Sequence, residues 1–195
     1  MKANILMLTL FSSLLLVSCN NAKIKDDKKE ISSEIEENEP KPIGLWEINN
    51  YTDEFGEKSS EKFLLLSGEG EFSNSATSGS RMTALLFVSK SERVWIRLIE
   101  YDSYIVKNDN RYECKIKDSE GIVHDFLLHN EEEYGDMYIY EESYENTEKE
   151  SDFISILKKG GIVTFSIKEK YAYSTPDKYL FKMDVTGFEE AFKQL

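Results

Sequence analysis

Short runs of alternating apolar and polar residues follow one another from about residue 45 to residue 185, with turn residues between them. The runs Met82 to Ser89 and Arg93 to Tyr101 flank a turn at 90–92, and the runs Arg111 to Asp118 and Ile122 to His129 flank a turn at 119–121. Alternation with a period of two is typical of strands with one buried face, and short connections favour antiparallel hairpins. The pattern predicts an all-β domain.

Other segments with the same alternation of apolar and polar residues are predicted to form the remaining strands. They are Leu45 to Tyr51, Lys62 to Ser67, Asp136 to Glu141, Gly161 to Glu169 and Lys178 to Val185. Many short strands in about 150 residues favour two packed antiparallel sheets. We therefore predict an antiparallel β-sandwich, immunoglobulin- or jelly-roll-like, and we assign the glycine-containing stretch 68–71 to a loop.

Two short helices are predicted near the end of the chain. The first begins after Ser151 as N-cap and stops at Lys158-Lys159-Gly160, since cations and then glycine are typical of a helix C-terminus. The second is C-terminal, because Phe188, Ala191, Phe192 and Leu195 share one helical face. This segment is too short to form a stable helix alone, so we expect it to dock on the sheet.

The first 18 residues have the anatomy of a signal peptide, with a basic start and an apolar stretch from Ile5 to Val17. The segment Leu16-Val17-Ser18-Cys19 resembles the lipobox of bacterial lipoproteins. That resemblance implies cleavage before Cys19 and lipidation of this residue, which would anchor the protein to a membrane. The absence of Asp directly after Cys19 indicates the outer membrane, facing either the periplasm or the cell surface.

Residues 19–43 form a lipidated cysteine followed by a charged tether. This segment has no aromatic residue and few apolar ones, so it is predicted to be disordered. The domain follows at 44–195. The formal charge of the chain is −13, which argues against nucleic acid as a partner and against electrostatic adhesion to an anionic membrane.

The run from Arg93 to Tyr101 is the first candidate binding surface. If the face with Val94 and Ile96 is core, the opposite face presents Trp95 between two arginines, with a tyrosine beyond. Such a surface fits a cation–π ladder, a sugar-stacking platform or a protein hot spot. Alternatively, both faces are covered and Trp95 is core. The candidate binding residues here are Arg93, Trp95, Arg97 and Tyr101.

Tyrosines and acids alternate between Glu131 and Asp152, which makes this segment the second candidate. Tyr138 and Tyr140 share a strand face opposite Met137, so they could offer contact area to a partner. The alternative is a solvated charged edge that deters strand pairing. The spacing of a calcium-binding loop is absent.

Nothing in the sequence indicates catalysis, so we expect no enzyme, no cofactor and no metal site. His124 and His129 would lie on opposite faces of one strand, which prevents a shared metal site. Cys114 lies on the same face of its strand as Tyr112 and is interpreted as a buried apolar residue.

Spaced apolar stretches of the domain resemble a group of small exported bacterial proteins associated with type VI secretion, the TagO or VasI-like group. The stretches are Gly44 to Ile48, Ala84 to Val88, Arg93 to Ile96, Phe153 to Phe165 and Tyr179 to Phe192. Those proteins often carry a cysteine where this chain has Val88-Ser89. The resemblance implies a β-sandwich, and no functional residue is carried over from it.

These observations favour a non-catalytic cell-envelope lipoprotein that binds an envelope protein as an accessory, inhibitor or immunity-type module. The alternative is a carbohydrate or small-ligand binding module, with hydrolytic activity a further option, that uses surface aromatics. An open groove lined by Trp95 and Tyr101 would favour the alternative, and a flat or convex patch would favour protein binding.

Overall fold

The computed structural model describes residues 45–140 and 148–195, and all of them belong to one compact unit. The signal peptide, Cys19 and the tether lie outside the described residues, as do 141–147, so the predictions made for these segments stay predictions. Among the described helices, none is long and apolar enough to cross a membrane.

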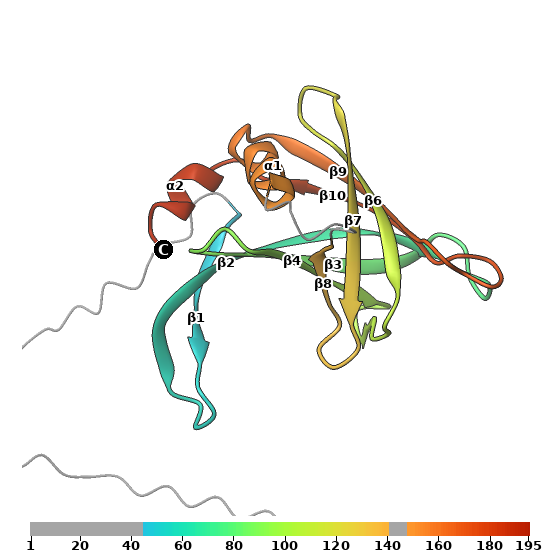
Figure 1. Ribbon diagram of the computed structural model, residues 1–195, viewed down its shortest axis with the longest axis horizontal. Coiled ribbons are helices and arrows are strands. Elements are labelled where there is room, and N and C mark those ends of the chain that lie inside the picture. Colours follow the sequence, from blue (N-terminus) through green and yellow to red (C-terminus); the bar gives the residue numbers. More distant parts are fainter. Residues whose placement is uncertain (1–44, 141–147) are drawn as a thin grey trace, which may run out of the picture. The chain divides into compact units, whose positions relative to one another are not determined.

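The described chain folds into ten strands and two helices (Figure 1). The elements are β1 (Glu47–Thr52), β2 (Lys58–Ser73), β3 (Ser80–Ser89), β4 (Val94–Glu100), β5 (Tyr104–Ile105), β6 (Arg111–Lys117), β7 (Val123–Glu131), β8 (Asp136–Ile139), α1 (Glu148–Lys158), β9 (Ile162–Glu169), β10 (Lys178–Asp184) and α2 (Phe188–Phe192). The all-β class and the two short helices, one of them C-terminal, are confirmed.

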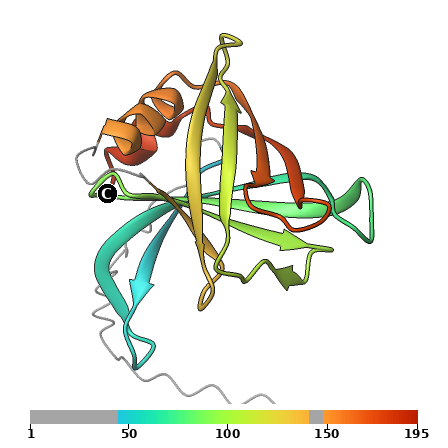
Figure 2. The same cartoon turned by 45° about the vertical axis from the view of Figure 1, so that its right-hand side comes forward.

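Eight of these strands close into an antiparallel barrel (Figure 2). Around the barrel, β2 pairs with β3, β3 with β4, and β4 with β8; then β7, β6, β9 and β10 follow, and β10 pairs with β2. The strand β1 extends the sheet beyond β2, outside the barrel, and β5 pairs with the end of β4.

The predicted β-sandwich is therefore wrong, including the one implied by the family resemblance. Two short pairings join what would have been separate sheets: residues 178–181 pair with 70–73, and residues 95–97 pair with 136–138. Sandwiches and barrels give the same alternation along each strand. Closure depends on pairings between remote segments, which local patterning does not report.

The predicted loop at 68–71 is also wrong, because these residues lie inside β2. A side chain at Gly68 would approach Met183 Cγ to 2.7 Å, and a side chain at Gly70 would collide with the carbonyl oxygen of Leu180. These two glycines permit a close approach of β10 to β2, which is what glycine inside a strand often indicates. They allow the barrel to close.

Both predicted hairpins are confirmed, and both helices pack near one end of the barrel (Figure 1). The ring of Phe153 in α1 lies 5.3 Å from that of Phe126 and 6.2 Å from that of Phe165. In α2, Phe188 packs against Trp46 at 5.2 Å. The helix α1 begins at Glu148, so Ser151 lies inside it and is not its N-cap.

The interior of the barrel is filled by apolar side chains from every one of the eight strands. Cys114 belongs to this core and is fully buried, as predicted. Burial raises the pKa of its thiol far above the ordinary value, so the thiol stays protonated and unreactive.

Candidate binding groove

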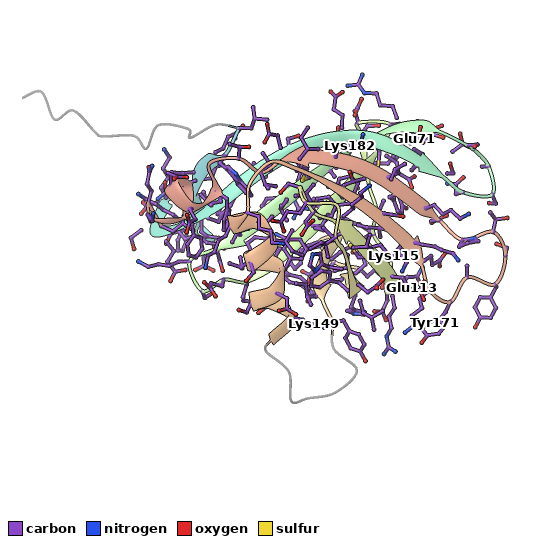
Figure 3. All side chains as sticks on the ribbon, turned by 90° about the horizontal axis from the view of Figure 1, so that it is seen from above. Glu71, Glu113, Lys115, Lys149, Tyr171 and Lys182 are labelled. Atoms are coloured by element: carbon purple, nitrogen blue, oxygen red, sulfur yellow. The ribbon has the colours of Figure 1, made fainter. Side chains whose placement is uncertain are left out.

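The outer face of the barrel has two kinds of surface. Outward side chains of β6 and β10 are exposed and mostly charged, as Figure 3 shows for Glu113, Lys115 and Lys182. Outward side chains of the first half of β2, the second half of β3 and the adjoining parts of β4 and β8 are instead largely apolar and at least half-buried, whereas Glu69 and Glu71 further along β2 are exposed. The half-buried apolar set is Phe63, Leu65, Leu85, Phe87, Trp95 and Tyr138. An apolar outer face on one side of a barrel is the kind of patch that marks an interaction site.

Five rings from five strands form an aromatic row across this face. Trp95 pairs in register with Phe87 on one side and with Tyr138 on the other. The ring of Trp95 stacks on Phe87 at 5.1 Å with an angle of 2°, and on Tyr138 at 6.2 Å with an angle of 28°. Phe63 lies 5.9 Å from Phe87, and Tyr51 lies 4.9 Å from Phe63. The rings of Phe87, Trp95 and Tyr138 therefore stack on one another along the row, and their edges point away from the sheet.

A groove of about 700 Å³ is lined by three rings of this row, and we call it the Trp95 groove. Its lining includes Trp95 from β4, Tyr138 from β8 and Tyr51 from β1. The hairpin of β1 and the first half of β2 bends away from the barrel (Figure 1), and it contributes one wall. The volume falls within the range of about 300–1,000 Å³ typical of sites for small ligands or short segments.

Arg93 lies exposed over the groove, with its guanidinium 5.4 Å from the ring centre of Tyr138. Its charge lowers the pKa of the hydroxyls of Tyr51 and Tyr138. Burial nevertheless raises the pKa of both hydroxyls above the ordinary value of 10.0. Both tyrosines are therefore neutral hydrogen-bonding groups at physiological pH.

The charged side chains along the groove are mainly positive. Lys62, Lys90 and Arg93 line it, and Glu61 is the one acidic side chain among the lining residues. In the part of the chain that the structure describes, none of the three cations makes an ion pair with a carboxylate. The protein as a whole carries a charge of −13, so this groove differs in sign from its surroundings.

Arg97, the other predicted arginine, has a different role. Its Nε donates to Asp136 Oδ1 at 2.8 Å, and a second nitrogen donates to Oδ2 at 3.0 Å. The side chain of Asp136 is 9% exposed. This bidentate pair joins β4 to β8 directly beside the Trp95–Tyr138 stack, so Arg97 holds the floor of the groove in place.

Tyr101 and Tyr140 lie outside the groove. Tyr101 follows the end of β4 with a φ of 51°, and its ring meets the edge of Phe72, an inward residue of β2, at 5.0 Å. Tyr140 packs beneath the guanidinium of Arg111 at 4.6 Å and lies 6.2 Å from His129. The structure therefore brings together Arg93, Trp95 and Tyr138 and leaves these two tyrosines apart.

The sequence analysis missed Tyr51, which lines the groove, and it missed Phe63 and Phe87, which belong to the aromatic row beside Trp95. A signal existed for Phe87: with a three-residue connection at 90–92, counting outward from Ser89 and Arg93 sets residue 87 opposite Trp95, as the structure has it. Tyr51 and Phe63 join the row through the bend of β2, for which no local signal is evident.

The two histidines do not share a site. They lie on opposite faces of β7, as predicted, and each contacts an aspartate: His124 Nε2 lies 3.1 Å from Asp118 and His129 Nε2 lies 3.2 Å from Asp109. Across residues 45–140 and 148–195, no group of three or more His, Cys, Asp or Glu side chains is arranged to hold a metal ion.

Comparisons with protein-family models, curated proteins and solved structures find no significant match for this chain. The resemblances to bacterial lipoproteins and to the TagO or VasI-like group stay predictions.

Proposed function

We propose that the protein is a non-catalytic binding module of the bacterial cell envelope that holds a segment of a partner protein in the Trp95 groove. The observation that carries this proposal is the apolar outer face of β2, β3, β4 and β8. Aromatic side chains combined with arginine are enriched where proteins bind one another.

The pattern of β3 supports a covered outer face. Ala84 to Val88 is a continuous apolar run, which is typical of a strand buried on both sides. Leu85 on this strand faces outward and is only half-buried. A partner docked on this face would remove the remaining apolar surface from water, which is the main driving force for association.

The orientation of Trp95 supports a protein partner over a sugar. A sugar ring stacks on the open face of an aromatic ring, but the two faces of Trp95 are already against Phe87 and Tyr138. The edges of these rings remain available, and ring edges pack well against the side chains of a peptide. The stack also keeps the floor rigid, which lowers the entropic cost of binding.

Carbohydrate or small-ligand binding is the second candidate. The groove is hollow, and the hydroxyls of Ser60, Ser89 and Ser91 line it beside Tyr51. Hydroxyls and a tilted tyrosine suit a polar ligand such as a glycan. A groove lined by both Trp95 and Tyr101 would favour this candidate, and only Trp95 lines the groove.

The anchoring part of the proposal rests on the sequence alone. Lipidation at Cys19 would hold the domain at a membrane, most simply the outer membrane, through the tether 19–43. Tethering raises the effective concentration of the groove near other envelope proteins, so even a modest affinity would suffice there.

Chemical crosslinking in intact cells tests the proposal. Wild type is compared with Trp95→Ala, with Ser91→Trp, which obstructs the rim without changing its charge and leaves the stack intact, and with Tyr173→Ala as a control. Tyr173 is a fully exposed aromatic residue in the β9–β10 loop. We expect wild type and Tyr173→Ala to capture the same protein and both groove variants to lose it. Capture that both groove variants retain, or no capture by wild type, would overturn protein binding at this groove.

A further inference from the structure

We propose that the segment bound in the Trp95 groove is acidic, with an apolar side chain seated against Trp95 and carboxylates that pair with Lys62, Lys90 and Arg93. This inference rests on the proposed function and specifies the chemistry of the partner.

The charges along the groove carry the inference. Lys62 lies on β2, Lys90 in the β3–β4 turn, and Arg93 immediately before β4, and residues at these three separate positions line one groove. In the described part of the chain, each lacks a carboxylate partner. The amino groups of Lys115 and Lys159, by contrast, lie 2.6 to 2.8 Å from carboxylates.

The combination of an apolar floor with cationic walls specifies the occupant further. The edge of the Trp95–Tyr138 stack would contact an apolar group, whereas a polyanion without such a group would leave the floor uncovered. Arg93 already lies over the ring of Tyr138, so its guanidinium is held in position and can donate hydrogen bonds to a carboxylate without losing that contact. An acidic segment with one aromatic or aliphatic residue satisfies both surfaces.

The charge of the whole protein makes this preference selective. A chain of charge −13 repels acidic partners at long range. An acidic segment therefore depends on local cations, such as those lining this groove, in order to dock.

Three capped pentapeptides of equal length test the inference: EEFEE, QQFQQ and KKFKK. Each is titrated into the purified full-length chain, labelled with ¹⁵N in its tryptophans. The chain has two tryptophans, and Trp95→Phe assigns the indole signals. We expect EEFEE to shift the Trp95 signal saturably, QQFQQ to bind more weakly, and KKFKK to have no effect. Raising the salt from about 0.05 M to about 0.5 M should weaken EEFEE binding, because the pairs are exposed.

Charge reversal provides the matched control. Lys62→Glu with Lys90→Glu should weaken EEFEE binding about three- to tenfold and improve KKFKK binding. Lys178→Glu with Lys182→Glu changes the charge equally on the outer face of β10 and should have no effect on either peptide. Equal binding of EEFEE and QQFQQ, preferential binding of KKFKK, or no shift of the Trp95 signal by EEFEE would overturn the acidic-segment inference. The crosslinking experiment judges protein binding separately, because its readout does not depend on the charge of the partner.

Discussion

At the scale of single residues, two arginines on one strand face perform different tasks. Arg93 is exposed over Tyr138 and pairs with no carboxylate among the described residues, so it is available to a partner. Arg97 lies four residues further along the chain, in the middle of β4. Its guanidinium donates to both oxygens of the nearly buried Asp136 carboxylate. The two arginines are equivalent in the sequence pattern. Alternation predicts which face of a strand a residue occupies, but it does not predict which residue lies next to it on the neighbouring strand.

Arg97→Ala is therefore expected to destabilise the fold, whereas Arg93→Ala is not. Loss of Arg97 leaves the Asp136 carboxylate nearly buried without its cation, which should lower the free energy of unfolding by about 2–3 kcal/mol. Arg93→Ala should change it by less than about 0.5 kcal/mol. Urea denaturation measures both values. Addition of Asp136→Ala to Arg97→Ala should recover part of the loss, and an equal loss for both single variants would refute this distinction.

Residue-level prediction succeeded where a strand could be followed and failed where it ended. The alternation from Val94 correctly assigned Trp95 to the outer face. Tyr101 was expected on the same face, but β4 ends at Glu100 and positive φ angles at Tyr101 and Asp102 turn the chain. Residues other than glycine, asparagine and aspartate rarely adopt such angles, so a tyrosine at position 101 did not predict the end of the strand there.

At the scale of elements, one buried aspartate joins the β6–β7 hairpin to the end of α1. Asp118 Oδ1 accepts hydrogen bonds from the backbone N–H groups of Glu120 and Ile122, at 3.0 and 2.8 Å. Its Oδ2 accepts from Lys159 Nζ at 2.8 Å and lies 3.1 Å from His124 Nε2. Hydrogen bonds from Lys159 and its neighbours hold the pKa of Asp118 well below its ordinary value of 3.8.

Asp118→Asn should weaken the fold at neutral pH and reduce its sensitivity to acid. A depressed pKa contributes stability that is present above the ordinary value of 3.8 and is lost as the pH falls toward the folded-state pKa. We expect the variant to raise the unfolding equilibrium constant about tenfold at pH 7 and to lose less stability than wild type below pH 3.8.

Thermal unfolding between pH 7 and pH 2 measures this effect, with Asp125→Asn as the control. Asp125 pairs with Lys115 on the surface, where both side chains are more than half exposed, so its replacement should leave the pH dependence unchanged. Parallel curves for wild type and Asp118→Asn would contradict the assigned role of Asp118.

Element-level prediction followed the same division between local and remote contacts. Hairpins with short connections were correct because adjacent alternating runs determine their own pairing. The closure of β2 with β10 involves four residue pairs from segments about 110 residues apart, and that of β4 with β8 involves three pairs from segments about 40 residues apart. Nothing within either segment encodes its partner, so a sandwich was the natural but incorrect prediction.

At the scale of the whole molecule, the barrel separates its stability from its recognition surface. Helix α1 and the filled interior form the core, and the charged outer faces of β6 and β10 suit contact with water. The apolar outer face of β2, β3, β4 and β8 is not needed to complete that core. Such a division would allow one face to bind while the barrel remains rigid, which suits the proposed binding module.

Site-specific photocrosslinking in intact cells tests most directly whether the Trp95 groove is a protein-binding surface. A photoreactive amino acid replaces Ser91 at the rim of the groove or Ser103, an exposed residue in the turn at the opposite end of β4. We predict a light-dependent adduct of one defined mass from position 91 and none of that mass from position 103. No adduct from position 91, or the same adduct from both positions, would contradict a protein-binding groove.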